Sequence, residues 1–190
     1  MFKHLHWKYD VLREEMYKKF GDRVIFAHEI TRCSRKNELE KSYSWTRFSS
    51  WLVPSILLGE VVHEGFAKIF GEQTAPYVKP LGDYIISGSP DAMINDKPAE
   101  VKFQRTAPES PKEHHIDRLK LYMWLTGSDE GYLIYLTPER VAAFTVNETV
   151  SDVAVMGMLK KMYPRYEWEC RLCQFSGICE FAQTERRNRD

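Results

Sequence analysis

The sequence lacks several features that would place it in a large class of proteins. It carries 27 Lys plus Arg and 27 Asp plus Glu, so its formal net charge is zero and no overall basic field favours nucleic acid. Any phosphate binding must therefore come from local patches. No secretory signal is expected, because Met1–Asp10 is polar and charged with no apolar run behind it. The longest apolar stretch, Trp51–Val62, is interrupted by Pro54, Gly59 and Glu60, so we expect no membrane span and a soluble, cytoplasmic protein.

The length and composition predict one globular domain. Hydrophobic residues make up 43% of the 190 residues and aromatic residues 13%, which is enough to bury a core. The order helix, three strands, helix, two strands indicates an α/β layout. Helices are predicted over residues 7–20, 54–70, 113–126 and 148–163, and strands within 77–103 and over 131–136 and 141–146. A short extended run is predicted over 24–30, and partial helix from 37 to 51.

One short segment concentrates charged residues of both signs, GSPDAMINDKPAEVK. It predicts two strands joined by a tight turn over 95–98. Side chains alternate along a strand, so Glu100 and Lys102 share one face and Val101 the other. If the hairpin brings Asp91 beside them, two carboxylates and an ammonium meet, as divalent cations and phosphoryl chemistry require. Solvated charges flanking a turn are the alternative.

A histidine on the predicted helix 54–70 offers a further ligand. A lone helix histidine is more often structural or exposed, which is the alternative at His63. Gly65 favours the functional interpretation, because a glycine inside a helix costs about 1 kcal/mol and usually marks a close approach. We expect a strand or a phosphodiester to approach the helix there.

The four cysteines are divided one plus three along the chain. Cys33 stands alone, whereas Cys170, Cys173 and Cys179 form a C-terminal triplet with the pattern C-x-x-C-x5-C. Disulfides are not expected, because the cytosol keeps thiols reduced. Four thiolates suit a metal centre that joins the two ends of the chain, and both zinc and an iron–sulfur cluster accept them. The isolated Cys33 favours the cluster, since zinc sites usually show two paired knuckles. Four unrelated buried thiols are the remaining alternative.

Taken together, these motifs resemble the PD-(D/E)xK nuclease superfamily, and within it the RecB-like, CRISPR-associated Cas4 exonucleases. Pro90-Asp91 followed by Glu100-Val101-Lys102 after eight residues matches the catalytic motif, and His63-x-Gly65 matches the upstream histidine motif. Cys33 with Arg35 and the C-terminal triplet match the cluster-binding segments. The resemblance covers roughly residues 30 to 182, and the order and spacing of the motifs together are specific.

The resemblance implies a fold and a division of the chain. The expected fold is a PD-(D/E)xK restriction-endonuclease-like α/β core, a central mixed sheet flanked by helices, with an iron–sulfur cluster joining the N- and C-terminal segments. The expected single nuclease domain, 1–190, comprises an N-terminal helical segment 1–53 that supplies one cluster cysteine, a core 54–163, and a C-terminal cluster-binding segment and tail 164–190.

The resemblance also implies a divalent-metal-dependent deoxyribonuclease. His63, Asp91, Glu100 and the Val101 carbonyl are expected to hold Mn²⁺ or Mg²⁺, and Lys102 to orient the attacking water and stabilise the phosphate. The family carries Gln-x-x-x-Tyr on the next helix. This chain has Arg118-x-x-x-Tyr122 instead, so the two residues are expected to position the strand, or Arg118 to pair with a catalytic carboxylate.

Cofactors and partners follow from the same resemblance. The four cysteines are expected to hold a 4Fe–4S cluster, with 2Fe–2S as the alternative. The expected substrate is single-stranded DNA or DNA ends, and the expected role is CRISPR spacer acquisition with integrase proteins. A stand-alone RecB-like repair nuclease and a catalytically idle iron–sulfur or zinc DNA-binding module are the alternatives. Tyr43, Trp45 and Trp51, interleaved with Lys41 and Arg47, are candidates to stack single-stranded bases, with a place in the core as the alternative. In the idle-module alternative, the basic tail of Arg186, Arg187 and Arg189 docks nucleic acid or a partner.

Overall fold

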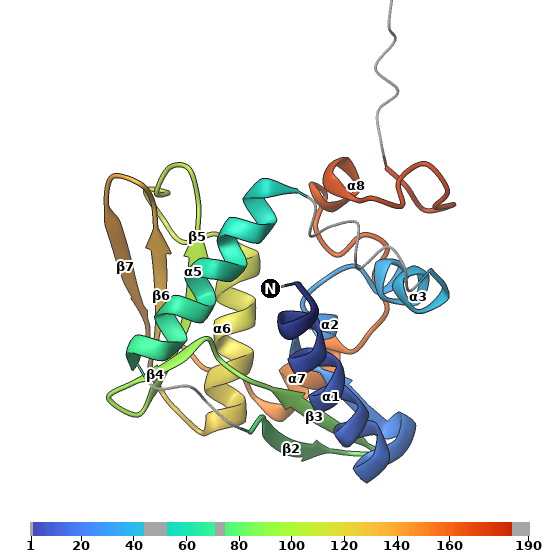
Figure 1. The fold of residues 1–190 in the computed structure, drawn as a ribbon. Helices are drawn as coiled ribbons and strands as arrows, with labels where there is room; N and C mark the ends of the chain where they lie inside the picture. Colours follow the sequence, from blue (N-terminus) through green and yellow to red (C-terminus); the bar gives the residue numbers. More distant parts are fainter. Residues whose placement is uncertain (1, 44–52, 71–74, 184–190) are drawn as a thin grey trace, which may run out of the picture.

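Two mixed β-sheets, held apart by one buried helix, organise the protein (Figure 1). The structure, a computed structural model, describes residues 2–43, 53–70 and 75–183, with the backbone alone for residues 2–10. One sheet has the strand order β1-β3-β2, with β1 parallel and β2 antiparallel to β3. The other has the order β4-β5-β6-β7, in which only β5 and β6 are parallel. The strands are β1 Val24–Phe26, β2 Tyr77–Leu81, β3 Tyr84–Gly88, β4 Ala92–Ile94, β5 Lys97–Phe103, β6 Gly131–Leu136 and β7 Val141–Val146.

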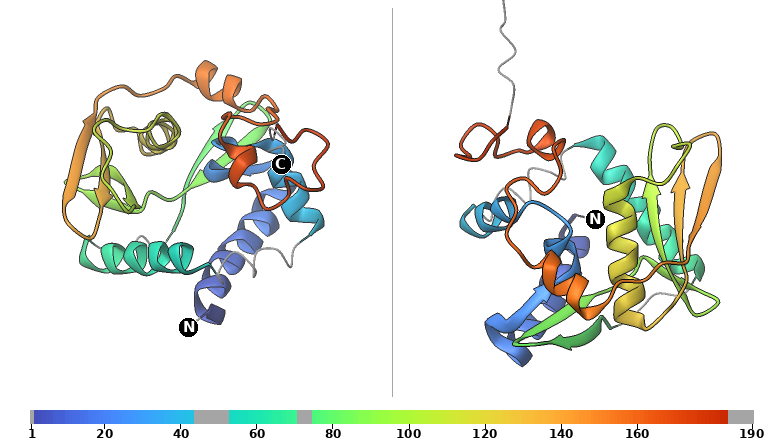
Figure 2. Two further views of the ribbon diagram at one scale, coloured as in Figure 1. Left: turned by 90° about the horizontal axis from the view of Figure 1, so that it is seen from above. Right: turned by 180° about the vertical axis from the view of Figure 1, so that it is seen from behind.

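Helix α6 (Glu113–Thr126) fills the space between the two sheets, as the view from above shows (Figure 2). One side of the helix, with Leu119 and Met123, packs on Leu133 and Tyr135 of the four-stranded sheet. The other side carries Leu121, Tyr122, Trp124 and Leu125 and packs with Leu81 and Ile86 of the three-stranded sheet. Because apolar residues surround most of the helix, it is a core helix rather than an amphipathic surface helix.

Helix α5 (Pro54–Phe70) covers the opposite face of the four-stranded sheet. Phe66 packs there against Val101 and Ile134, whose side chains alternate with those facing α6. This sheet therefore lies between two helices. The remaining helical elements are α1 Phe2–Phe20, η1 Gly21–Arg23, α2 Ala27–Ile30, α3 Ser34–Ser42, α7 Asp152–Met158 and α8 Glu169–Leu172.

Several predicted elements are confirmed within the described residues. Helices α5 and α6 and strands β6 and β7 have the predicted bounds, and Gly127, with φ of 74°, ends α6 in the left-handed conformation. The α/β class is also confirmed. None of the described helices combines the length and apolar character that crossing a bilayer requires.

Other predictions were wrong in their details. The single central sheet is two sheets, and residues 77–103 form four strands rather than three, because the chain also breaks at Ser89–Asp91. The helix predicted over 148–163 is only α7, which begins where the Ser151 side chain accepts a hydrogen bond from the Ala154 amide. The first helix begins at Phe2, not at Trp7. The extended run predicted over 24–30 is a strand only at β1, Val24–Phe26, and continues as helix α2, Ala27–Ile30.

No described strand approaches Gly65, so that half of the prediction is wrong, while approach of a phosphodiester stays a prediction. A methyl group added at Gly65 would meet no described atom within 4 Å. At Gly88, the end of β3, the same methyl would lie 2.7 Å from the Ala27 Cβ and 3.1 Å from Leu125 and Tyr122. Gly88 is therefore the glycine that lets β3 pack closely on α2 and α6.

The two glycines form a matched test of this packing. We expect Gly88→Ala to lower the free energy of unfolding by about 1–3 kcal/mol, because the Ala27 Cβ is fixed to its backbone and cannot move aside. Gly65→Ala should instead raise it by up to about 1 kcal/mol, because alanine is the better helix former. Urea denaturation followed by far-UV circular dichroism measures both, and equal effects of the two substitutions would contradict the assignment.

Candidate active site

Asp91 is placed by the hairpin between β4 and β5. Asn95 and Asp96, with φ of 50° and 61°, make the two-residue turn, which requires the left-handed conformation that Asn and Asp tolerate. The turn pairs Ala92 with Ala99 and so brings the start of β4 beside the middle of β5. The Val101 amide donates a hydrogen bond of 2.7 Å to Asp91 Oδ2. The carboxylate is therefore fixed across β5.

The two charged residues of β5 point away from α5. Val101 packs under α5, whereas Glu100 and Lys102 lie on the face that α6 covers, opposite Leu133 and Tyr135 in the parallel register. This is the alternation that the sequence predicted. Glu100 is thereby enclosed between the sheet and α6, with only 1% of its surface exposed.

The ammonium of Lys102 lies among the groups predicted to bind a divalent cation. Its Nζ is 2.5 Å from Glu100 Oε1 and 3.9 Å from Asp91 Oδ2, and it donates a hydrogen bond of 3.0 Å to the Val101 carbonyl. His63 Nδ1 lies 3.2 Å from Asp91 Oδ1. The Lys102 ammonium thus contacts three of the four predicted ligand groups. The fourth group, the His63 imidazole, contacts Asp91. We refer to His63, Asp91, Glu100 and Lys102 as the charged cluster.

Glu100 is the least solvated charge in this cluster. Apart from its ion pairs with Lys102 and Arg118, neither of its buried oxygens accepts a hydrogen bond from a described residue. Burial raises the pKa of Glu100, as does the charge of Asp91, while Lys102 and Arg118 oppose the shift. A buried carboxylate with unsatisfied oxygens is a site that favours a cation.

The pKa of Asp91 is lowered and the pKa of His63 is raised, because the two side chains pair with each other. Burial would raise the pKa of Asp91, but Lys102 and His63 outweigh it and lower the value to about 2. Burial likewise opposes protonation of His63, yet the hydrogen bond and charge of Asp91 raise the pKa of the imidazole. Asp91 is therefore ionised at any working pH.

Arg118 and Tyr122 occupy successive turns of α6 but have different surroundings. Arg118 Nη1 lies 3.6 Å from Glu100 Oε1, and its Nε donates a hydrogen bond of 3.3 Å to Thr31 Oγ1. Tyr122 is buried in the core beside Gly88. Of the two residues expected to position the strand, Arg118 contacts the charged cluster, as the predicted ion pair, and Tyr122 lies in the core.

All four cysteines line one cavity of about 320 Å³, which we call the thiol cavity. It lies where α8 and the following loop approach α3, side by side in Figures 1 and 2. Lys102, His115 and Arg118 line the same cavity, so the thiol cavity reaches the lysine of the charged cluster. Burial is the main cause that raises the pKa of Cys33, which keeps that thiol protonated while no cation is near.

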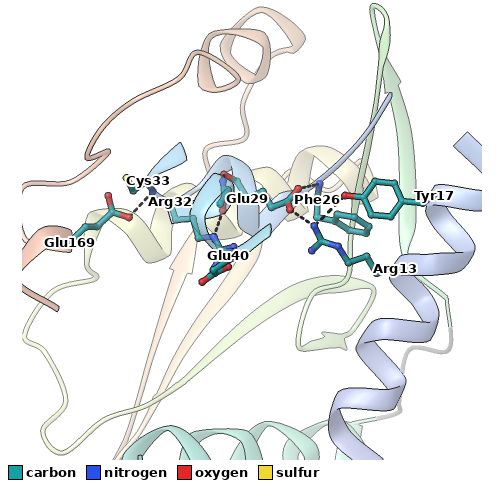
Figure 3. Close-up of polar contacts among 9 residues, drawn as sticks. Arg13, Tyr17, Phe26, Glu29, Arg32, Cys33, Glu40 and Glu169 are labelled. Atoms are coloured by element: carbon teal, nitrogen blue, oxygen red, sulfur yellow. Dashed lines mark hydrogen bonds and ion pairs between the residues drawn. The ribbon is translucent and has the colours of Figure 1, made fainter. Parts of the chain in front are cut away.

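Glu169 joins the two ends of the chain beside this cavity. The Cys33 amide donates a hydrogen bond of 2.8 Å to Glu169 Oε1, as Figure 3 shows. The other oxygen, Oε2, accepts hydrogen bonds of 2.8 and 3.0 Å from the Arg165 and Tyr166 amides. Nearby, Arg13 pairs with Glu29 at 2.6 Å and so fixes α1 on α2 (Figure 3). The N-terminal segment is therefore held against the C-terminal segment by the Glu169 hydrogen bonds, and also by the ion pairs Arg35–Glu180 and Lys161–Glu38.

The donor atoms of the charged cluster and of the thiol cavity are of the chemical types that the implied cofactors require, but they are not arranged in a coordination geometry. Within the described ranges, no three His, Cys, Asp or Glu side chains are grouped as they would be around an ion. In the charged cluster the Lys102 ammonium lies between the carboxylates. In the thiol cavity, all four cysteines are among the lining residues, and thiolate sulfur is the donor that an iron–sulfur cluster or zinc requires.

The comparison with known proteins agrees with this geometry. No family model matches the chain. A curated relative, the CRISPR-associated exonuclease Cas4 of Saccharolobus solfataricus, is 30% identical over 189 residues, covering 88% of this chain and 93% of the relative. The chain belongs to the Cas4 exonuclease family. It is therefore a CRISPR-associated nuclease. A solved structure described as that of SSO0001 superimposes with a TM-score of 0.79 and 28% identity, covering 97% of this chain and 98% of that one.

One carboxylate near the cluster of this Cas4-family protein was missed in the sequence. Glu60 lies on α5 one helical turn before His63. Burial raises the pKa of Glu60, and the charges of Asp91 and Glu64 raise it further. The spacing Glu60-x-x-His63, which puts both side chains on one face of a helix, is the signal that could have identified it.

Some expected DNA contacts of the Cas4 chain lie outside the described residues. These include Trp45, Arg47 and Trp51 and the basic tail of Arg186, Arg187 and Arg189. Tyr43 is described and exposed, and its ring lies 6.2 Å from that of Phe175.

The pairing of His63 with Asp91 can be tested by titration. In metal-free protein, Asp91→Asn removes the anion that most favours the imidazolium. Burial and the Lys102 charge then outweigh the smaller effect of Glu100, so the pKa of His63 should fall below its ordinary value of about 6.5. Two-dimensional NMR of the imidazole across the pH range measures this shift. The His28 signal, from α2, is the internal control. An unchanged His63 pKa would show that the two side chains do not interact.

Proposed function

We propose that this Cas4-family nuclease is a divalent-metal-dependent deoxyribonuclease that hydrolyses phosphodiester bonds of single-stranded DNA or of DNA ends. The observation that carries the proposal is the position of the Lys102 ammonium, enclosed by Glu100, Asp91 and the Val101 carbonyl. The same oxygen groups are those that Mn²⁺ and Mg²⁺ prefer, and His63 adds a nitrogen donor beside them.

The chain's residues would divide the work as follows. His63, Asp91, Glu100 and the Val101 carbonyl would hold the ion, which when bound lowers the pKa of a water and neutralises charge on the phosphate. Lys102, on a flexible stem beside these groups, would orient the attacking water and donate to the phosphate oxygens. Arg118, already close to Glu100, would add a second cation toward the bound strand. Tyr122 would support Arg118 from the core.

We propose further that the four cysteines bind a 4Fe–4S cluster with a structural role. All four line the thiol cavity, and the one-plus-three division along the chain would join its ends. The Glu169 hydrogen bonds bring Cys33 to the C-terminal segment without any cofactor, so the site would be partly arranged before it is loaded. In the cell, we propose action in the cytoplasm during spacer acquisition with integrase proteins; a stand-alone repair nuclease would use the same chemistry.

Lys102→Ala tests the proposed chemistry. We expect degradation of 5′- and 3′-labelled single-stranded DNA with Mn²⁺ to fall by roughly 10²-fold to 10⁴-fold, because a positioned proton donor and cation is lost. The fold should persist, since Arg118 still faces Glu100 and the buried carboxyl can take up a proton.

Lys97→Ala is the matched control for this experiment, because Lys97 lies on the same strand but pairs with Asp129 at the surface. Wild-type rates in Lys102→Ala would remove this residue from the mechanism. No cleavage by the wild-type protein, with either metal, would favour the idle DNA-binding module.

Iron and sulfide analysis tests the cluster. Protein purified without oxygen should contain about four iron and four sulfide per chain and absorb visible light, and Cys173→Ser should lose most of both. Ser176→Ala, which changes the same cavity without touching a thiol, should retain them. A colourless wild-type protein loaded with zinc would exclude the iron–sulfur cluster and favour a zinc site.

A further inference from the structure

A chain of hydrogen bonds fixes His115 at the start of α6. The Lys112 amide donates to the Tyr135 hydroxyl at 3.0 Å, and that hydroxyl lies 2.9 Å from His115 Nδ1. Tyr135 is fully buried, and no other described group accepts its proton. If Nδ1 carried the hydrogen, a buried O–H would be left without an acceptor, which is costly. The hydroxyl therefore donates to Nδ1, and the imidazole carries its hydrogen on Nε2.

The surroundings of His115 keep its ring neutral. Burial lowers the pKa of His115 to about 2, and His114, Lys102, Lys112 and Arg118 lower it as well. The ring is therefore a hydrogen-bond donor without a charge. It cannot serve as a general base, because Nδ1 is occupied and so low a pKa gives no driving force for taking up a proton.

His115 lines the thiol cavity, which carries the two cationic side chains Lys102 and Arg118 on its wall. Among the described residues, none accepts a hydrogen bond from His115 Nε2. His115 also lies in the first turn of α6, where the helix dipole favours an anion. These groups would repel a metal ion, and together they suit a phosphate.

We propose that His115 donates its Nε2–H to a non-bridging phosphate oxygen of the bound DNA strand, in a subsite formed with Arg118 between the charged cluster and the thiol-lined end of the cavity. The inference rests on the proposed deoxyribonuclease function and adds to it a substrate-binding residue. Tyr135 is a positioning residue in this scheme, because it acts on DNA only through the tautomer of His115.

Two substitutions at position 115 distinguish the contribution of the N–H donor from that of the aromatic ring. His115→Phe keeps an aromatic ring of similar shape but removes the N–H group, and a hydrogen bond to a charged oxygen is lost. We expect the Kd for a labelled single-stranded oligonucleotide, measured in Ca²⁺, to rise roughly 10-fold to 100-fold. His115→Gln has an amide N–H at a similar reach and should restore the Kd to within about 3-fold of wild type. Tyr135→Phe should give an intermediate loss.

A chemically altered strand distinguishes direct contact from a structural role. Single phosphates of the oligonucleotide are replaced in turn by uncharged methylphosphonate. When methylphosphonate replaces the phosphate that His115 contacts, the wild-type protein should lose affinity. The same replacement should weaken binding by His115→Phe very little, because that variant already lacks the contact. If the losses are additive at every position, or if His115→Phe binds and cleaves as wild type does, the inference is overturned. Thermal melting of each variant shows whether it is folded.

The outcomes also separate this inference from the proposed function. If the wild-type protein binds the oligonucleotide in Ca²⁺ but does not cleave it in Mn²⁺, the deoxyribonuclease proposal fails, while the methylphosphonate comparison still decides the role of His115. If the wild-type protein cleaves and His115→Phe matches it, the subsite fails and the deoxyribonuclease proposal stands.

Discussion

The ion pair between Glu100 and Lys102 is the interaction on which the rest of the site depends. It joins two side chains of one strand at 2.5 Å, with 1% of Glu100 exposed. A carboxylate taken out of water at that depth costs several kcal/mol unless a cation compensates it. The sheet and α6 enclose the pair, so the fold stabilises a negative charge where only a cation can satisfy it. Lys102 can leave Glu100 when another positive charge replaces it or when the carboxyl takes up a proton, because burial already raises the pKa of Glu100. In the proposed function, binding of a cation at Glu100 would release the lysine toward substrate.

A second carboxylate, Glu169, shapes the space around that pair. It accepts one hydrogen bond from Cys33 and two from the Arg165 and Tyr166 amides, joining residues 136 positions apart along the chain. The thiol cavity exists because these two ends meet, and its walls include Lys102 and His115. A cofactor on the four thiols would therefore act on the charged cluster through the shape of one shared cavity, with no direct bond between the two sites.

The sequence predicted those features that depend on local chemistry. Period-3.6 patterns with Pro54 and Gly127 at the ends fixed α5 and α6, and Asn95-Asp96 with flanking β-formers located the hairpin that carries Asp91. Features decided by distant contacts were not predictable. The chain divides into two sheets because α6 fills the space between them. The later start of α7 has a local cause instead, because the Ser151 side chain caps the helix there. The tautomer of His115 depends on Tyr135, 20 positions away on another strand.

Arg118 stands where the motif Gln-x-x-x-Tyr has glutamine, and this difference changes the charge balance of the site. Lys102 and Arg118 together neutralise Asp91 and Glu100, so the charged cluster is balanced before any divalent ion binds. A glutamine at position 118 would leave one negative charge uncompensated and would favour a cation more strongly. The hydrogen bond from Arg118 Nε to Thr31 Oγ1 helps to hold the guanidinium beside Glu100. In the proposed function, arginine at this position would therefore weaken the attraction of the site for a metal ion and would supply a guanidinium that can leave Glu100 for a DNA phosphate.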